Sequence, residues 1–119
     1  MSAVITLKSR FDFDRVYQNG RSCANHMLIM YMLPNSLSVD RFGLVVSKKV
    51  GNSVIRHRAR RLMKESVRLT GRIGKQGFDI ILLARPEIRD KKMSDVKDAF
   101  HHLLTIMRHK SRGGNGPSL

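Results

Sequence analysis

The most constraining feature of the sequence is a basic stretch between residues 41 and 68. It contains nine Lys and Arg side chains and a single carboxylate, Glu65, and so supplies +8 of the formal charge of +14 of the 119-residue chain. Like charges four residues apart on a helix repel each other and cost a few tenths of a kcal/mol per pair. A polyanion partner is the simplest account of such a stretch, and nucleic acid is the first candidate.

Within this stretch, Asn52 or Ser53 can cap a helix that runs to about Leu69. At about 100° per residue, the apolar positions gather on one stripe. The stripe comprises Ile55, Ala59, Leu62, Met63 and Ser66. The opposite side is cationic and comprises Arg56, His57, Arg60, Arg61, Lys64 and Arg68, with Val67 as its one apolar residue and Arg58 at its border. A face of mixed sign is usually only solvated, but this face has one sign, so we expect it to bind phosphates.

Local signals predict the remaining elements. We expect helices over residues 9–19 and 95–109, and strands over residues 27–33, 41–49 and 78–85, the first two strands forming an antiparallel pair. Most methionines, Phe11 and Phe100 are expected in the core. The element order indicates an α+β protein, with helices on one face of a mainly antiparallel sheet. We expect one domain over residues 1–110 and a disordered Gly-rich tail over residues 111–119.

Several classes of protein are disfavoured by composition. The single cysteine, Cys23, excludes an intramolecular disulfide framework, and no Cys/His cluster has zinc-site spacing. The longest apolar run, Met27 to Leu33, has seven residues, whereas a membrane span needs about twenty. The nine carboxylates are scattered and form no catalytic pair or metal cluster by spacing. We therefore expect a cytoplasmic protein with no membrane contact, no organic cofactor and no catalytic residue of its own.

The stretch from Phe42 to Arg68 reads FGLVVSKKVGNSVIRHRARRLMKESVR. It resembles the signature of the bacterial ribonuclease P protein component, which is of the type FGxxVSKKVGNAVxRNRxKRxxRE. The resemblance extends over most of the chain, because residues 7–22 resemble the opening helix of the family, residues 27–35 its next strand and residues 79–86 its last strand. In one departure, His57 stands where the family usually has Asn.

The resemblance implies a fold and a function. The fold would be a two-layer α/β sandwich, ribosomal protein S5 domain 2-like, with a left-handed βαβ crossover through the basic helix, although the general handedness rule favours the opposite hand. The function would be that of an accessory subunit of ribonuclease P, bound to a large catalytic RNA that removes the 5′ leader from precursor tRNA. The RNA and the substrate would hold the catalytic Mg²⁺ ions, and no protein partner is expected.

The resemblance also implies two RNA-facing surfaces. The basic motif would contact the catalytic RNA through Lys48, Lys49, Asn52, Arg56, His57, Arg58, Arg60, Arg61, Lys64 and Arg68, although the two lysines could instead reach leader phosphates. A cleft between the first helix and the sheet would receive the single-stranded leader, with Phe13, Tyr17 and Tyr31 stacking on unpaired bases. From spacing alone, ordinary core packing of these three aromatic residues is the favoured alternative.

Three other functions are compatible with a basic chain of this size. A ribosomal or general RNA-binding protein without a role in cleavage would show the same charge and core, and only the family motif discriminates against it. A helix-turn-helix module would read base edges with a helix N-terminus, but here the arginines extend along four turns after a strand. An intrinsic nuclease would need a metal site, and no candidate is found.

Overall fold

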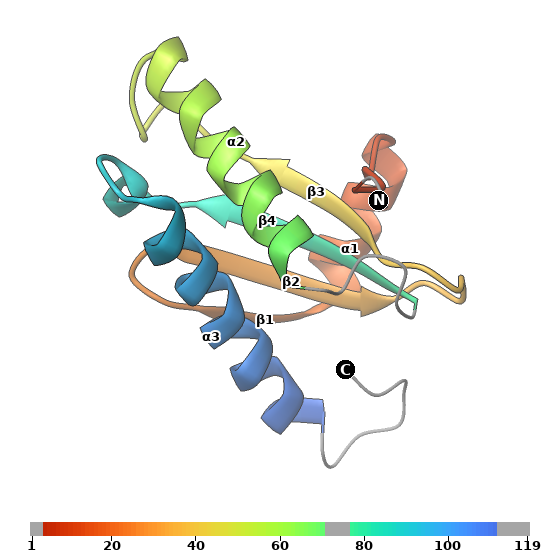
Figure 1. Cartoon of the computed structure of the whole chain (residues 1–119). Coiled ribbons are helices and arrows are strands. Elements are labelled where there is room, and N and C mark those ends of the chain that lie inside the picture. Colours follow the sequence, from red (N-terminus) through yellow and green to blue (C-terminus); the bar gives the residue numbers. More distant parts are fainter. Residues whose placement is uncertain (1–3, 71–76, 112–119) are drawn as a thin grey trace.

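The computed structural model describes residues 4–70 and 77–111 (Figure 1). Of the predicted tail, residues 111–119, Ser111 is the last residue of the C-terminal helix, and residues 112–119 lie outside the described residues. The elements in chain order are α1 (Arg10–Asn19), β1 (Arg21–Ala24), β2 (Leu28–Pro34), β3 (Arg41–Val45), α2 (Ser53–Leu69), β4 (Phe78–Ala84), the short 3₁₀ helix η1 (Pro86–Ile88) and α3 (Met93–Ser111). The three helices and three longer strands therefore form where local signals predict them. No local pattern in the sequence predicts the bounds of β1, a four-residue strand with three exposed residues.

The four strands form one sheet in the order β1-β2-β4-β3. β1 and β2 are antiparallel, β2 and β4 are antiparallel, and β4 and β3 are parallel. The mainly antiparallel sheet is confirmed, but the predicted pairing of β2 with β3 is wrong. β4 lies between them because its residues are almost all buried, and such an apolar strand is stable only with a neighbour on each edge.

The parallel pair is joined by α2, which makes β3, α2 and β4 a βαβ unit. In Figure 1 both strands point to the left, β3 lies above β4, and α2 crosses in front of the sheet. This arrangement is a left-handed crossover, as the family resemblance implies and contrary to the common right-handed rule.

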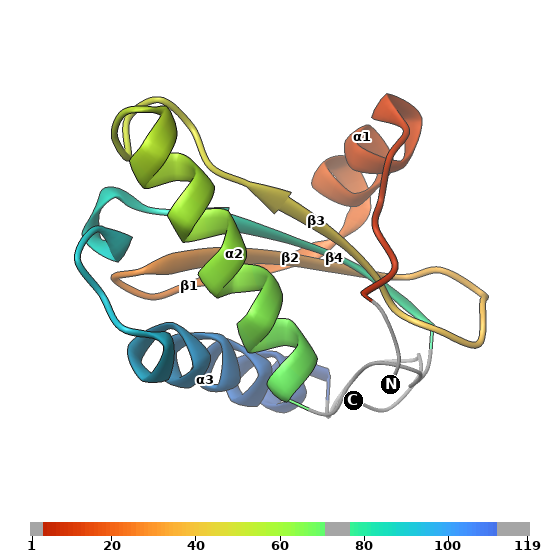
Figure 2. The same ribbon diagram turned by 45° about the horizontal axis from the view of Figure 1, so that its top comes forward.

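The helices occupy both faces of the sheet (Figure 2). Alternate residues of the central strands face opposite sides, so that Met30, Ile80 and Leu82 pack with α2 and α3 in the larger core. Ile81 packs on the other side with Val16 of α1 in a smaller core. The expectation of all helices on one face therefore holds for α2 and α3 but is wrong for α1. The central strands carry apolar side chains on both faces, so a helix must pack on each face to bury them.

Two predicted burials are also corrected. Val67, assigned to the cationic side of the basic helix, is fully buried in the larger core, so the buried stripe of α2 is wider than predicted. Phe11, expected in the core, is 75% exposed. The buried side of its helix is centred on Val16, and Phe11, five residues earlier, lies on the side that faces solvent. Phe100 is fully buried and lies edge-on to Phe42, as expected for a core residue.

Candidate nucleic-acid interface

The basic helix α2 is anchored at its start and along one side. The Asn52 side chain caps the helix by accepting a hydrogen bond from the Ile55 N–H at 3.0 Å. Ala59, Met63 and Val67 are buried against the sheet and α3. These contacts fix which side of the helix faces solvent, and that side carries the arginines.

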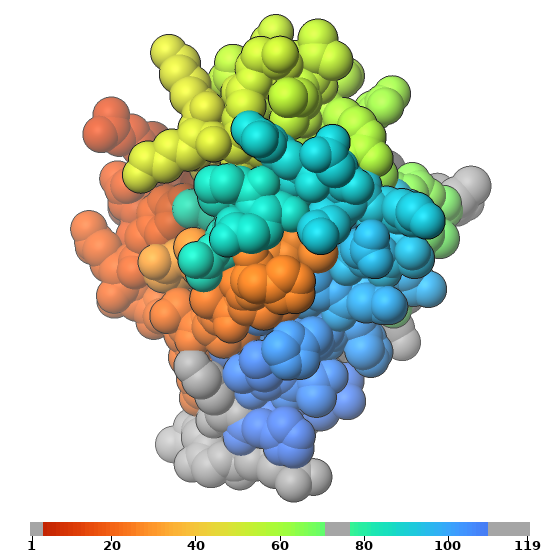
Figure 3. All heavy atoms as spheres, turned by 90° about the vertical axis from the view of Figure 1, so that its left-hand side faces the viewer, coloured from red at the N-terminus to blue at the C-terminus, as the bar shows by residue number. Residues whose placement is uncertain are grey.

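Most of the predicted RNA-binding residues are exposed on or beside α2. The exposed residues are Lys48, Lys49, Asn52, His57, Arg58, Arg60, Arg61 and Lys64, whereas Arg56 and Arg68 are partly buried. The structure thus brings the predicted set together on one continuous surface, formed by the loop after β3 and the outer side of α2. Figure 3 shows this loop, the start of α2 and the segment around η1 side by side at one end of the molecule.

Three of these arginines have local constraints. The Arg58 guanidinium donates from Nη2 to the Lys91 carbonyl at 2.7 Å, which ties α2 to the segment after η1. Arg68 forms an ion pair with Glu65 one turn earlier. Arg56 has a buried Nε without a hydrogen-bond partner among the described residues. Arg60, Arg61 and Lys64 are also exposed on the helix, and Lys48 and Lys49 add two exposed cations from the loop before it.

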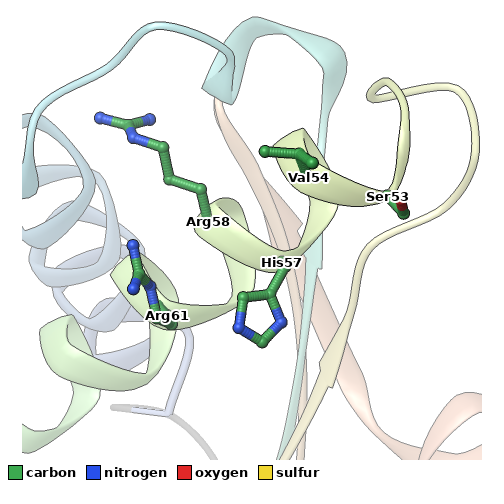
Figure 4. Close-up of a pocket in the computed structure, with 5 residues that line it drawn as sticks. All are labelled: Ser53, Val54, His57, Arg58 and Arg61. Carbon is green, nitrogen blue, oxygen red and sulfur yellow. The ribbon is translucent and has the colours of Figure 1, made fainter.

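A hollow of about 560 Å³ opens beside the first turns of α2 (Figure 4). Its lining combines one apolar side chain, Val54, which is 76% exposed, with the polar and cationic side chains of Ser53, His57, Arg58 and Arg61. Val54 places an exposed apolar side chain within a cationic surface, a combination that suits a nucleobase next to its phosphate. Neither charge nor periodicity indicates this hollow from the sequence.

The three predicted aromatic residues also meet, on the opposite side of the sheet. Phe13 and Tyr17 lie on one side of α1 with ring centroids 6.4 Å apart, and Tyr17 lies edge-on to Tyr31 of β2 at 5.0 Å. Tyr17 is 37% exposed, whereas Phe13 and Tyr31 are partly buried and pack against the smaller core. The cluster therefore both contributes to the core and presents aromatic surface to solvent.

Two local features describe how closely the aromatic cluster is packed. A side chain at Gly43 of β3 would meet the Phe13 ring, since a Cβ there would lie 2.5 Å from Phe13 Cζ. Burial raises the pKa of the Tyr17 hydroxyl above its usual value, and the neighbouring Tyr31 adds to the rise. Tyr17 therefore stays neutral at physiological pH and can stack on a base or donate a hydrogen bond.

A charged cluster that the sequence analysis missed lies beneath α1. Its centre is Asp79 of β4, a fully buried carboxylate held by Arg15, Arg41 and Asn35. Burial alone would raise the pKa of the Asp79 carboxyl, but the hydrogen bonds from Arg41 and Asn35 and the charges of Arg41 and Arg15 outweigh it and hold the pKa below its usual range. The signal in the sequence is a lone carboxylate at the start of an otherwise apolar strand.

Residues 4–70 and 77–111 contain neither a candidate metal site nor a candidate membrane-spanning helix. No three His, Cys, Asp or Glu side chains in these ranges come together in a group that could hold a metal ion. Within the same ranges, no helix has the length and apolar character required to cross a membrane.

The comparison with known families decides the classification of the chain. The family model described as ribonuclease P matches residues 1–108. The chain belongs to the ribonuclease P protein family. Membership makes it a protein component of ribonuclease P, an endoribonuclease that contains an RNA and acts in tRNA 5′ processing.

Individual ribonuclease P proteins match along nearly their whole length. The ribonuclease P protein component of Lachnoclostridium phytofermentans is 45% identical over 112 residues, which cover 94% of this chain and 95% of that protein. That of Alkaliphilus metalliredigens is 47% identical over 102 residues, which cover 86% of this chain and 92% of that protein. Both matches include the basic helix and the sheet, so the resemblance is not confined to one charged motif.

Solved ribonuclease P proteins share the fold. The Staphylococcus aureus RNase P protein superposes with a TM-score of 0.78 at 31% identity, covering 88% of this chain and 96% of that chain. The Thermotoga maritima RNase P protein, at 24% identity and a TM-score of 0.74, covers 82% of this chain and 93% of that chain and supports the fold alone.

Proposed function

We propose that this protein is the RNA-binding subunit of a ribonuclease P in which a catalytic RNA removes the 5′ leader from precursor tRNA. The observation that carries the proposal is the division of the molecule into two different surfaces. The cationic side of α2 lies over one face of the sheet, and the aromatic cluster of Phe13, Tyr17 and Tyr31 lies on the other. One protein of this design can hold two RNA segments at once.

The cationic side of α2 is assigned to the catalytic RNA. Exposed arginines along a helix neutralise phosphates and release counterions, which provides affinity with little dependence on sequence. The hollow lined by Val54 and His57 can receive an unstacked base. The loop residues Lys48 and Lys49 extend the cationic surface toward the cleavage site or the leader.

The aromatic cluster is assigned to the single-stranded leader. Every base has a π face, so aromatic side chains bind unpaired bases with little sequence preference, at about 1–3 kcal/mol per base. Such binding suits a protein that must accept leaders of different sequence and would broaden the range of substrates. Partial exposure of Tyr17 supports this role, because a ring buried entirely in the core could not stack on a base.

The chemistry is assigned to the RNA. Phosphodiester cleavage with Mg²⁺ needs ions held between carboxylates or phosphates, and the described residues offer no such group of carboxylates. The RNA subunit and the substrate would hold the Mg²⁺ ions. The protein would act in the cytoplasm, in keeping with its single cysteine.

The test is the affinity of the reconstituted holoenzyme for precursor tRNA with a leader and for mature tRNA. The protein should strengthen binding of the leader-bearing tRNA specifically, and Tyr17→Leu should remove part of this preference while the matched variant Tyr17→Phe retains it. We expect a loss of about fivefold or more for Tyr17→Leu, the equivalent of one stacked base. Equal losses for both tRNAs would show that the ring only supports the core.

A further inference from the structure

A network of charged residues joins α1 to the sheet. Asp79 of β4 points to the α1 side, where its carboxylate accepts hydrogen bonds from Arg41 Nε at 2.8 Å and Arg41 Nη2 at 2.7 Å. It also accepts from Asn35 Nδ2 at 2.8 Å and from Arg15 Nη2. One fully buried carboxylate thus connects β4, β3, the loop after β2 and α1.

α1 contributes two residues of opposite charge to this network. Arg15 reaches Asp79, and Asp12 Oδ2 lies 3.6 Å from Nη1 of Arg41. Asp12 Oδ1 lies 3.8 Å from Nη2 of Arg15, which closes the network within the helix. The Asp12, Arg15 and Arg41 side chains are each only 22–29% exposed, so solvent screens these pairs less than pairs on the open surface.

The position of the network on α1 couples it to the aromatic cluster. At about 100° per residue, Asp12 and Val16 share the side of the helix that faces the sheet, Arg15 lies on one flank, and Phe13 and Tyr17 lie on the other. Val16 is the one fully buried residue of α1, and Phe13 packs beside it against the smaller core. The ion pair of Arg15 with Asp79 holds the opposite flank of the helix. Contacts on both flanks oppose rotation of α1 about its own axis and so keep Tyr17 in place beside Tyr31.

We propose that Asp12, Arg15, Arg41 and Asp79 form a positioning network that holds α1 in the rotation at which Phe13 and Tyr17 present their rings to the single-stranded leader. The inference rests on the proposed function, since it assigns positioning residues to the leader surface. None of the four residues needs to touch RNA for the network to act.

Asp12→Asn tests the network, because a positioning role and a purely electrostatic effect predict opposite changes in RNA binding. The substitution removes the pairing with Arg41, while Asp79 remains compensated by both arginines and the fold is retained. Because the variant is more positive, a purely electrostatic effect would strengthen RNA binding. Positioning predicts instead that the preference of the holoenzyme for leader-bearing over mature tRNA falls by about two- to fivefold, the size of one ion-pair coupling.

Asp14→Asn is the matched control, because Asp14 lies on the same helix but, among the residues that the structure describes, pairs only with exposed Arg10, at 4.0 Å. It makes the same change in charge outside the network and should leave the leader preference intact. Asp12→Glu should restore part of the preference lost in Asp12→Asn. An unchanged preference in Asp12→Asn, or an equal change in Asp14→Asn, would overturn the proposal.

The free protein offers a second readout that does not depend on RNA. The chain has two tyrosines and no tryptophan, and the tyrosines are Tyr17 and Tyr31, in contact with each other. The near-ultraviolet circular dichroism of the tyrosines therefore reports on this cluster, and it should change in Asp12→Asn but not in Asp14→Asn. If the wild-type holoenzyme shows no leader preference, the proposed function fails, while an unchanged spectrum in Asp12→Asn overturns the network itself.

Discussion

At the scale of single residues, the arginines of α2 differ in how neighbouring groups hold their side chains. Arg58 is hydrogen-bonded to the Lys91 carbonyl and Arg68 is paired with Glu65. Arg60 and Arg61 are exposed on the outer side of the helix. The sequence predicts which residues share the cationic side, but not this difference, which depends on neighbours that are distant in the chain.

Replacing Arg60 or Arg61 by Ala should weaken binding of the catalytic RNA and reduce its dependence on salt. Each phosphate contact contributes about one unit to the slope of log affinity against log salt concentration. The measurement is a titration of the RNA with each variant at several salt concentrations. Lys97→Ala, which removes an exposed cation of α3, is the control and should leave the slope unchanged. An unchanged slope in Arg60→Ala and Arg61→Ala would refute the assignment of this surface.

At the scale of elements, local signals were sufficient for helices but not for strand pairing. Ser9 and Asn52 cap α1 and α2 where the sequence predicts helix starts, because capping depends on residues three positions apart. The pairing of β2 with β4 depends on contacts about fifty residues apart, and no local pattern predicts it. In the same way, the four-residue spacing places Phe13 and Tyr17 together, while their contact with Tyr31 comes from the tertiary fold.

Because of the network between α1 and the sheet, the free energy of unfolding should decrease as the pH falls into the acid range. The fold holds the pKa of Asp79 below its usual value of about 3.9. Asp79 therefore contributes stability that is fully present above that usual value and is lost as the pH falls through the folded-state pKa. The difference in unfolding free energy between wild type and Asp79→Asn, measured with urea, should shrink from pH 5 toward pH 2. Asp14→Asn is the control, and a difference that grows in acid would contradict the sign of the shift.

At the scale of the whole molecule, the charge of +14 is balanced only when an anion is bound. Like charges on a compact chain repel one another and destabilise the folded state. The larger core between the sheet, α2 and α3 holds the fold together, while the cationic side of α2 concentrates the repulsion on one surface. Binding of a polyanion should therefore also stabilise the fold.

Sulfate should raise the melting temperature of the protein more than chloride at equal ionic strength. An anion that binds only the folded state stabilises it by mass action, and each kcal/mol raises the melting temperature by about 4 °C for a domain of this size. Thermal unfolding followed by far-ultraviolet circular dichroism measures the effect. Equal melting temperatures in the two salts would show that the cationic surface does not bind anions in the free protein.

The central claim is that this protein assists an RNA that performs the cleavage. The most direct test is cleavage of a 5′-extended precursor tRNA at low Mg²⁺ by bacterial ribonuclease P RNA alone, by the protein alone and by the two together. The account predicts faster cleavage at the mature 5′ end only when both are present. Cleavage by the protein alone would contradict the assignment of the chemistry to the RNA, and tight RNA binding without stimulation would reduce the protein to a general RNA-binding protein.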